Sequence, residues 1–168
     1  MNAAVLCVGR LRERHWREAA DEYEKRLSRY GRFEEIEIPD LPEPANASDA
    51  DRTRVMREEG AGLLRRIRED DEVIALCIDG KALSSVAFAQ LLSEAERSGR
   101  RQVFVIGGSL GLAPEVVRRA DRKLSFSPMT FPHQLARVML LEQIYRGCKI
   151  NAGEKYHKGH WRRHDIRF

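Results

Sequence analysis

Short apolar runs alternate with amphipathic stretches along the whole chain. Runs of strand length predict strands at residues 3–9, 32–38, 72–78, 102–106 and 122–127. Apolar residues at helical spacing predict helices at residues 14–30, 48–68, 84–98, 114–121 and 133–151. Strands that alternate with helices, and that are mostly apolar throughout, indicate an α/β fold with a parallel sheet covered by helices on both faces.

Glycines mark the expected breaks in this pattern. Asp79 and Gly80 are expected to close the third strand, and Gly60 and Gly62 are expected to weaken the middle of the second helix. Neither an internal repeat nor a low-complexity linker divides the chain. We therefore expect one α/β domain.

The helix predicted at residues 133–151 is apolar around most of its circumference. Its apolar residues include Val138, Met139, Leu140, Leu141, Ile144 and Tyr145. Such a helix must bury more than one face, so it is either a central core helix or a contact with a second copy of the protein. Glu142 and Arg146 are four residues apart on this helix and are expected to form an ion pair.

Basic residues are concentrated at the C-terminal end. The formal net charge is +4, and residues 146–168 alone carry seven basic and two acidic residues, which leaves −1 for residues 1–145. Such a segment is typical of contacts with a phosphate backbone, but it also suits a solvated basic C-terminus. The charge pattern leaves both interpretations open.

The three cysteines and the distribution of apolar residues narrow the class of protein. The chain has an odd number of cysteines, and they are widely spaced at Cys7, Cys77 and Cys148. This pattern predicts neither a disulfide framework nor a metal site, and it suits the reducing cytoplasm. The sequence contains no stretch of about eighteen apolar residues, so it predicts no membrane-spanning helix. We therefore expect a cytoplasmic protein with no metal and no membrane partner.

Two turns that follow predicted strands are unusual. Only Gly9 follows the first strand, which argues against a dinucleotide fingerprint, and no phosphate-binding loop of the Walker type is present. A glycine-rich turn, residues 107–111, follows the fourth strand and suits either a tight turn or close approach of a flat ligand. Residues 126–133 form an apolar, proline-containing loop that suits either an adenine pocket or burial under neighbouring structure.

Several short motifs occur in a fixed order along the chain. They are Leu76-x-x-x-Gly80-Lys81, Ile106-Gly107-Gly108-x-x-Gly111, Met129-Thr130-Phe131-x-His133-Gln134-x-x-Arg137, Glu142-Gln143-x-Tyr145-Arg146 and Tyr156-His157. In this combination the chain resembles the ribosomal large subunit pseudouridine methyltransferase H family of the knotted SPOUT superfamily. The resemblance extends from Val5 to His157.

The resemblance implies a fold and a reaction. It implies a C-terminal trefoil knot, a homodimer, and S-adenosylmethionine as the methyl donor. The implied activity is methylation of N3 of a pseudouridine in helix 69 of 23S rRNA on the assembled ribosome. The donor is implied to bind at Leu76, Gly107, Phe126, Ser127, Pro128, Met129, Thr130 and Phe131.

The resemblance also implies candidate catalytic residues, which are His133, Arg137, Tyr156 and His157. Tyr156 and His157 are expected to hold the pseudouridine, within one subunit or across the dimer interface, and Arg137 with the basic tail is expected to contact phosphate. Residues 1–157 would form the methyltransferase domain and residues 158–168 a basic extension, in which Trp161 suits stacking on a base. The alternatives are a related knotted methyltransferase acting on another RNA such as tRNA, and a non-catalytic ribosome-binding protein.

Overall fold

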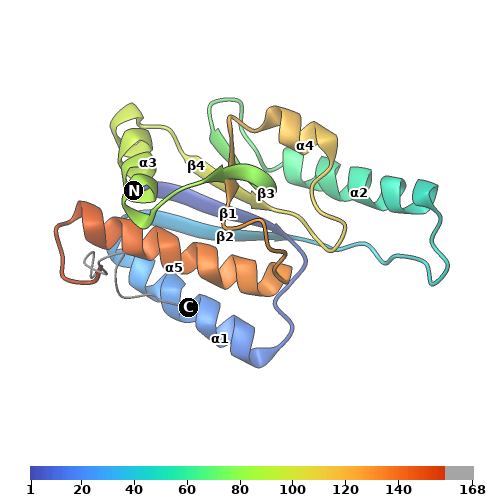
Figure 1. Cartoon of the computed structure of the whole chain (residues 1–168), viewed down its shortest axis with the longest axis horizontal. Helices are drawn as coiled ribbons and strands as arrows, with labels where there is room; N and C mark the ends of the chain where they lie inside the picture. Colours follow the sequence, from blue (N-terminus) through green and yellow to red (C-terminus); the bar gives the residue numbers. More distant parts are fainter. Residues whose placement is uncertain (158–168) are drawn as a thin grey trace.

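Five parallel strands form a single sheet in the computed structural model, which describes residues 1–157 (Figure 1). Their order across the sheet is β2-β1-β4-β3-β5. The strands are β1 (Asn2–Val8), β2 (Arg32–Ile38), β3 (Glu72–Ala82), β4 (Gln102–Ile106) and β5 (Arg122–Ser125). All four pairings between neighbours are parallel, which confirms the predicted α/β fold. The trefoil knot stays a prediction.

Helices cover both faces of this sheet, as predicted (Figure 1). The first face is covered by α1 (Arg14–Leu27), α3 (Ser85–Ser98) and α5 (His133–Asn151). A short 3₁₀ turn, Ser28–Tyr30, follows α1. The second face is covered by α2 (Asp49–Leu64) and α4 (Pro114–Arg119). None of these helices is long and apolar enough to cross a membrane.

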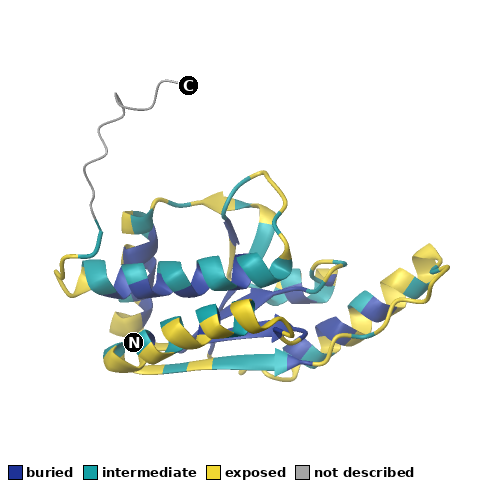
Figure 2. Cartoon of the chain, turned by 90° about the horizontal axis from the view of Figure 1, so that it is seen from below, coloured by how far each residue is buried: buried dark blue, intermediate teal, exposed yellow. Residues whose placement is uncertain are grey.

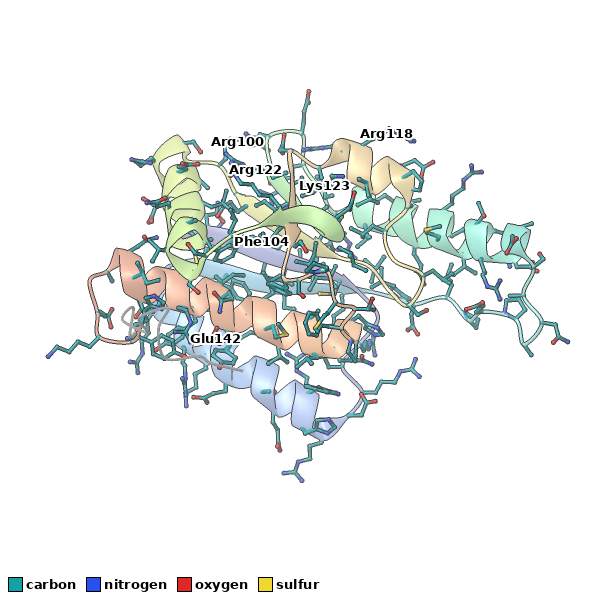
Figure 3. The ribbon with its side chains drawn as sticks, in the orientation of Figure 1. Arg100, Phe104, Arg118, Arg122, Lys123 and Glu142 are labelled. Atoms are coloured by element: carbon teal, nitrogen blue, oxygen red, sulfur yellow. The ribbon has the colours of Figure 1, made fainter. Side chains whose placement is uncertain are left out.

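Alternate residues of each strand enter two separate cores, which explains why the strands are apolar throughout. Val5 and Cys7 of β1 face α1, α3 and α5, together with Phe104 at the centre of β4 (Figure 3). Leu6 and Val8, the residues between and after them, face α2 and α4 instead. A strand that is buried on both faces cannot show polar alternation.

The third strand is longer than the sequence pattern predicts. Asp79 and Gly80 do not end it, because β3 continues to Ala82 and Leu124 of β5 pairs with both Leu76 and Lys81 across a bulge. A Cβ on Gly80 would lie 2.5 Å from the carbonyl carbon of Leu124. The glycine therefore permits the two strands to approach each other, and its prediction as a terminator was wrong.

The second helix shows another use of glycine. It begins after Ser48, whose side chain forms a capping box with Asp51, and it continues through Gly60 and Gly62 to Leu64, short of the predicted end at residue 68. A Cβ on Gly60 would lie 2.6 Å from the Cβ of Ala113, next to α4. Gly60 thus lets α2 pack closely beside α4.

The last helix lies between α1 and α3 and is covered on more than one side. Figure 2 shows buried and intermediate residues along α5, whereas α1 and the far end of α2 carry many exposed ones. Leu140, Leu141 and Ile144 are fully buried, and Tyr145 packs near Tyr23 of α1. The interpretation of α5 as a central core helix is confirmed.

Candidate active site

A cavity lies beyond the carboxyl ends of β4 and β5 and beside the bulge of β3, at the edge of the sheet where ligands of open parallel sheets bind. Its volume is about 650 Å³, within the range of about 300–1,000 Å³ typical of small-molecule sites. The lining comes from residues 76–78 in the middle of β3, the glycine-rich turn after β4, the loop after β5 and the first turn of α5.

Nearly all residues predicted to bind the donor line this cavity. They are Leu76, Gly107, Phe126, Ser127, Met129, Thr130 and Phe131. Pro128 lies within the same loop, but it does not contribute to the lining. His133, predicted as catalytic, also lines the cavity. The structure thus brings together three segments that are far apart along the chain.

The glycines after β4 are required by the turn itself. Gly108 and Gly111 form an isolated bridge, in which the Gly111 N–H donates to the Gly108 carbonyl at 3.0 Å. A Cβ on Gly107 would lie 2.5 Å from the carbonyl carbon of Gly111, and Gly111 has a φ of +82°. The sequence suited either a tight turn or close approach of a ligand at residues 107–111. The structure shows the tight turn, and this turn also forms one wall of the cavity.

Two serines fix the loop that forms the opposite wall. Ser125 Oγ donates to the Ile78 carbonyl at 2.9 Å, which ties the loop to the bulge of β3. Ser127 Oγ accepts from the Met129 N–H at 3.0 Å. Sequence reasoning missed Ser125 and Ile78, because nothing along the chain indicates that residues 47 positions apart meet.

The cavity is mainly apolar, with a few polar groups. Ser109, Thr130 and His133 supply polar side chains, and no acidic side chain of the described residues lines it. The lining also includes Cys77, whose pKa is raised by burial and by the nearby Asp79, so its thiol stays protonated near neutral pH. An apolar wall with exposed backbone groups suits a flat aromatic ring with a hydrogen-bonding edge, such as adenine.

A second cavity, of about 210 Å³, adjoins the first beyond the ends of β1 and β2. The two cavities share Gly108, Ser109 and His133 in their linings. Most other lining residues of the second cavity are polar or charged. They include Arg10, Arg12, Glu13, Asp40, Glu59 and Gln134. In residues 1–157 no group of three or more His, Cys, Asp or Glu is arranged to hold a metal ion.

Arg137, predicted to contact phosphate, is buried beneath these cavities with an exposed fraction of 3%. Its guanidinium donates to the carboxylates of Glu35, at 2.9 and 2.5 Å, and of Glu37, and to the Gly9 carbonyl at 3.2 Å. Arg17 joins the cluster through Glu35 at 2.9 Å. In this conformation Arg137 holds the ends of β1 and β2 against α5, and contact with RNA would require the cluster to open.

Tyr156 and His157 follow α5 and pack against its C-terminal half, whereas His133 is its first residue. The Tyr156 hydroxyl donates to Glu142 Oε1 at 3.2 Å, its ring packs on Tyr145, and His157 Nδ1 is 3.4 Å from Arg146 Nη1. Glu142, labelled on α5 in Figure 3, also forms the predicted ion pair, whose partner is Arg146. Thirteen residues of helix separate His133 from Arg146, which is about 20 Å at about 1.5 Å per residue. The candidate catalytic residues therefore do not form one site within a single chain.

Comparisons with known proteins identify the family of the chain. Residues 1–157 match the family described as "Predicted SPOUT methyltransferase". The chain is 51% identical over 159 residues to "Ribosomal RNA large subunit methyltransferase H" of Clostridium novyi (strain NT). It is 50% identical over 159 residues to the proteins of the same name from Alkaliphilus oremlandii (strain OhILAs) and Bifidobacterium animalis subsp. lactis (strain AD011). Each alignment covers 94% of this chain and 100% of the relative.

A solved structure shows the same fold at low sequence identity. It is titled "The structure of a probable methylase family protein from Haemophilus influenzae Rd KW20", and it superposes with a TM-score of 0.53 at 12% identity. The superposition covers 94% of this chain and 70% of that chain. The solved structure supports the fold, and the family match and the close relatives establish the family. The chain belongs to the SPOUT methyltransferase family and, within it, to the ribosomal RNA large subunit methyltransferase H family.

Proposed function

We propose that this protein transfers a methyl group from S-adenosylmethionine to N3 of a pseudouridine in helix 69 of 23S rRNA, on the assembled ribosome. The observation that carries the proposal is the cavity beyond β4 and β5 and beside the bulge of β3, which is lined by the residues that the family resemblance assigns to the donor. The close relatives are named as methyltransferases of large-subunit rRNA. A ribosomal substrate implies a cytoplasmic enzyme.

The donor supplies a methyl group on a positively charged sulfur, which needs no further activation. The chain has to bind it and align it with the acceptor atom. Leu76 and Phe126 offer apolar surfaces to the adenine ring, and the backbone of the Gly107 turn and of the loop at residues 126–131 offers hydrogen-bonding groups to its edge. The apolar walls also keep water from the methyl group.

We propose that two copies of the chain complete each active site. Along α5, His133 is about 14 Å from Glu142, which Tyr156 contacts, and about 20 Å from Arg146, which His157 contacts, so one copy does not gather them around one acceptor base. A symmetric dimer can place the Tyr156–His157 pair of one copy beside the donor cavity of the other. Large apolar side chains near that cavity are exposed and available for the contact, with Ile78 at 58% and Met129 at 71%.

Within such a dimer each candidate residue has a distinct task. Tyr156 and His157 of the second copy hold the pseudouridine, while His133 lies where the two cavities of the first copy meet. Arg137 positions the loop after β1 through the Gly9 carbonyl. The basic extension, residues 158–168 with Trp161, lies outside the described residues, and we propose that it contacts rRNA phosphates.

The test is transfer of labelled methyl from S-adenosylmethionine to ribosomes that lack the modification, with free rRNA, separated subunits and tRNA in parallel. We expect incorporation only into the assembled ribosome, mapped to N3 of the pseudouridine in helix 69. Incorporation into tRNA alone would favour the related-methyltransferase alternative. Failure of both methyl transfer and calorimetric donor binding would leave the non-catalytic ribosome-binding alternative.

A further inference from the structure

The smaller cavity beyond β1 and β2 has the size and the position of an acceptor subsite. Its volume of about 210 Å³ is large enough for a single flat heterocycle. It meets the donor cavity at Gly108, Ser109 and His133. A base in one cavity and a methyl donor in the other would face each other across this shared wall.

One carboxylate in this cavity is unusual. Glu59 of α2 is only 7% exposed, and its Oε1 accepts from the Leu41 N–H at 3.0 Å. Its Oε2 has no hydrogen-bond donor among residues 1–157. Among the described residues only Glu115 Oε2 is both fully buried and unpartnered, so Glu59 Oε2 is open to the cavity, where it can accept a hydrogen bond from a ligand.

The fold aims this carboxylate at the wall between the cavities. The buried stripe of α2 contains Val55, Glu59 and Leu63, which are four residues apart. Glu59 therefore occupies a position at which an apolar residue would be expected. A Cβ on Gly108 would lie 3.3 Å from Glu59 Oε2, so the oxygen touches the glycine-rich turn that separates the two cavities. The absence of a side chain at Gly108 leaves this approach open.

We infer that the smaller cavity receives the acceptor base and that Glu59 Oε2 is the catalytic base that takes the proton from its N3. This inference rests on the proposed function and supplies the base that the reaction needs. N3 of a uracil ring lies between two carbonyl groups and carries a hydrogen, so it has no free lone pair for attack until that proton leaves.

The step balances without a further reactant. The N3–H bond breaks and its proton forms a bond to Glu59 Oε2, which leaves an electron pair on N3. That pair forms the bond to the methyl carbon as the carbon–sulfur bond breaks, and the sulfur keeps the electrons of that bond as a neutral thioether. The Glu59 carboxyl then loses its proton to solvent through the mouth of the cavity.

The surroundings of Glu59 strengthen it as a base. Burial raises the pKa of its carboxyl above the ordinary value, the Leu41 N–H lowers it, and the nearby Asp40 raises it again, with a net rise. A base is most effective when its pKa lies closer to the working pH. The other charged or titratable groups that line the cavity are Arg10, Arg12, Glu13 and His133.

The test compares Glu59→Gln with wild-type protein in single-turnover methyl transfer to ribosomes between pH 6 and 9. Glutamine keeps the size and the acceptor for Leu41 but removes the base, so we expect transfer at pH 7 to fall by about 10²–10⁴-fold. The remaining activity should rise about tenfold per pH unit across this range, whereas the wild-type rate should level off. Donor affinity by calorimetry and the melting temperature should stay close to wild type.

The neighbouring Glu58 provides a matched control, because it is exposed on the same turn of α2 and pairs with Arg54. Glu58→Gln should leave rate and pH profile unchanged. In the donor-free protein, ¹³C NMR should show a glutamate carboxyl with a raised pKa that is missing in Glu59→Gln, whereas the signal of Glu24, whose pKa is also raised by burial, should remain. An unchanged rate and pH profile in Glu59→Gln, or a loss fully explained by weaker donor binding, would overturn the assignment. An inactive wild-type protein would instead remove the proposed function.

Discussion

Asp71 and Arg101 form a buried ion pair at the amino end of the sheet, away from both cavities. Arg101 donates to both oxygens of Asp71, at 2.9 and 2.6 Å, and Asp71 also accepts from the Arg68 N–H at 2.8 Å. The carboxylate is 1% exposed. Removal of one partner of such a pair leaves a buried charge without compensation, which usually costs about 3–5 kcal/mol.

We therefore expect Asp71→Asn to lower the free energy of unfolding by about 3 kcal/mol, at the low end of that range, because Glu34 still contacts Arg101 at 2.8 Å. Urea denaturation at pH 7 measures the change. Donor affinity should be unaffected, since the pair is at the opposite end of the strands. A loss below about 1 kcal/mol would contradict the importance of the pair.

The pKa of Asp71 allows a prediction of how the free energy of unfolding depends on pH. Burial alone would raise the pKa of Asp71, but its hydrogen bonds with Arg101 and Arg68 lower it below the ordinary 3.8. A lowered folded-state pKa stabilises the protein above the unfolded pKa, and this stabilisation is lost as the pH falls through the folded value. The difference between wild type and Asp71→Asn should thus be constant above about pH 5 and shrink below about pH 4. A difference that stays constant down to pH 2 would contradict this account.

At the scale of elements, substitution of the two glycines of α2 by alanine should have opposite effects on stability. Alanine is favoured over glycine within helices by about 1 kcal/mol, but a Cβ at Gly60 would meet the Cβ of Ala113 at 2.6 Å, which cannot move without its backbone. A Cβ at Gly62 would meet only the end of the flexible Ile38 side chain, at 2.9 Å.

We expect Gly60→Ala to destabilise the protein by about 1–2 kcal/mol and Gly62→Ala to be neutral or stabilising by up to about 1 kcal/mol. Thermal unfolding of the two variants, side by side, tests the prediction. Because Ala113 follows the glycine-rich turn, Gly60→Ala should also weaken donor binding. Equal stability of the two variants would show that α2 does not pack against the residues next to α4 as described.

The sequence pattern predicts the bounds of helices and strands well where burial determines them. It predicts them poorly where the pairing of strands determines them. The bounds of β2 and β4 agree with the predicted ones, and α5 begins and ends as expected, because apolar periodicity reports burial directly. The extension of β3 through Gly80 depends on its ladder with β5, which starts some forty residues later. The pairing of distant strands leaves no local signal.

In the candidate active site, too, features set by local pattern were predictable and contacts between distant segments were not. Residues after strand ends were predictable, because parallel strands bring their carboxyl ends to one edge. The environment of Arg137 was not, since its partner Glu35 lies 102 residues earlier and on another element. Glu59 was also missed, although a charged residue on the buried stripe of α2 was a visible signal. A titratable residue at an apolar position merits attention in any such sequence.

At the scale of the whole molecule, one basic cluster of the described residues is already paired with carboxylates. Arg100, Arg118, Arg122 and Lys123 lie together around β5 and α4 (Figure 3), yet each pairs with a carboxylate, as Lys123 does with Asp79 at 2.8 Å. We therefore expect rRNA phosphates to contact the basic segment that begins near the end of α5 rather than this paired cluster.

The central claim is that the donor cavity of one copy and the Tyr156–His157 pair of a second copy form one methyl-transfer site. Two inactive variants test it by mixing. In Gly107→Ala the added Cβ would lie 2.5 Å from the backbone of Gly111 and distort the donor cavity, while Tyr156→Ala with His157→Ala removes the acceptor contacts. Each variant alone should transfer no methyl, and calorimetry should show lost donor binding only in the first.

The decisive measurement is methyl transfer to ribosomes by the two variants after they are unfolded and refolded together in equal amounts. If sites are shared, each mixed dimer has one intact site, and random assembly should restore about a quarter of wild-type activity. If each chain forms its own site, every site in the mixture carries a lesion and activity stays absent. Restored activity is the result we predict, and its absence in a verified mixed dimer would contradict the account.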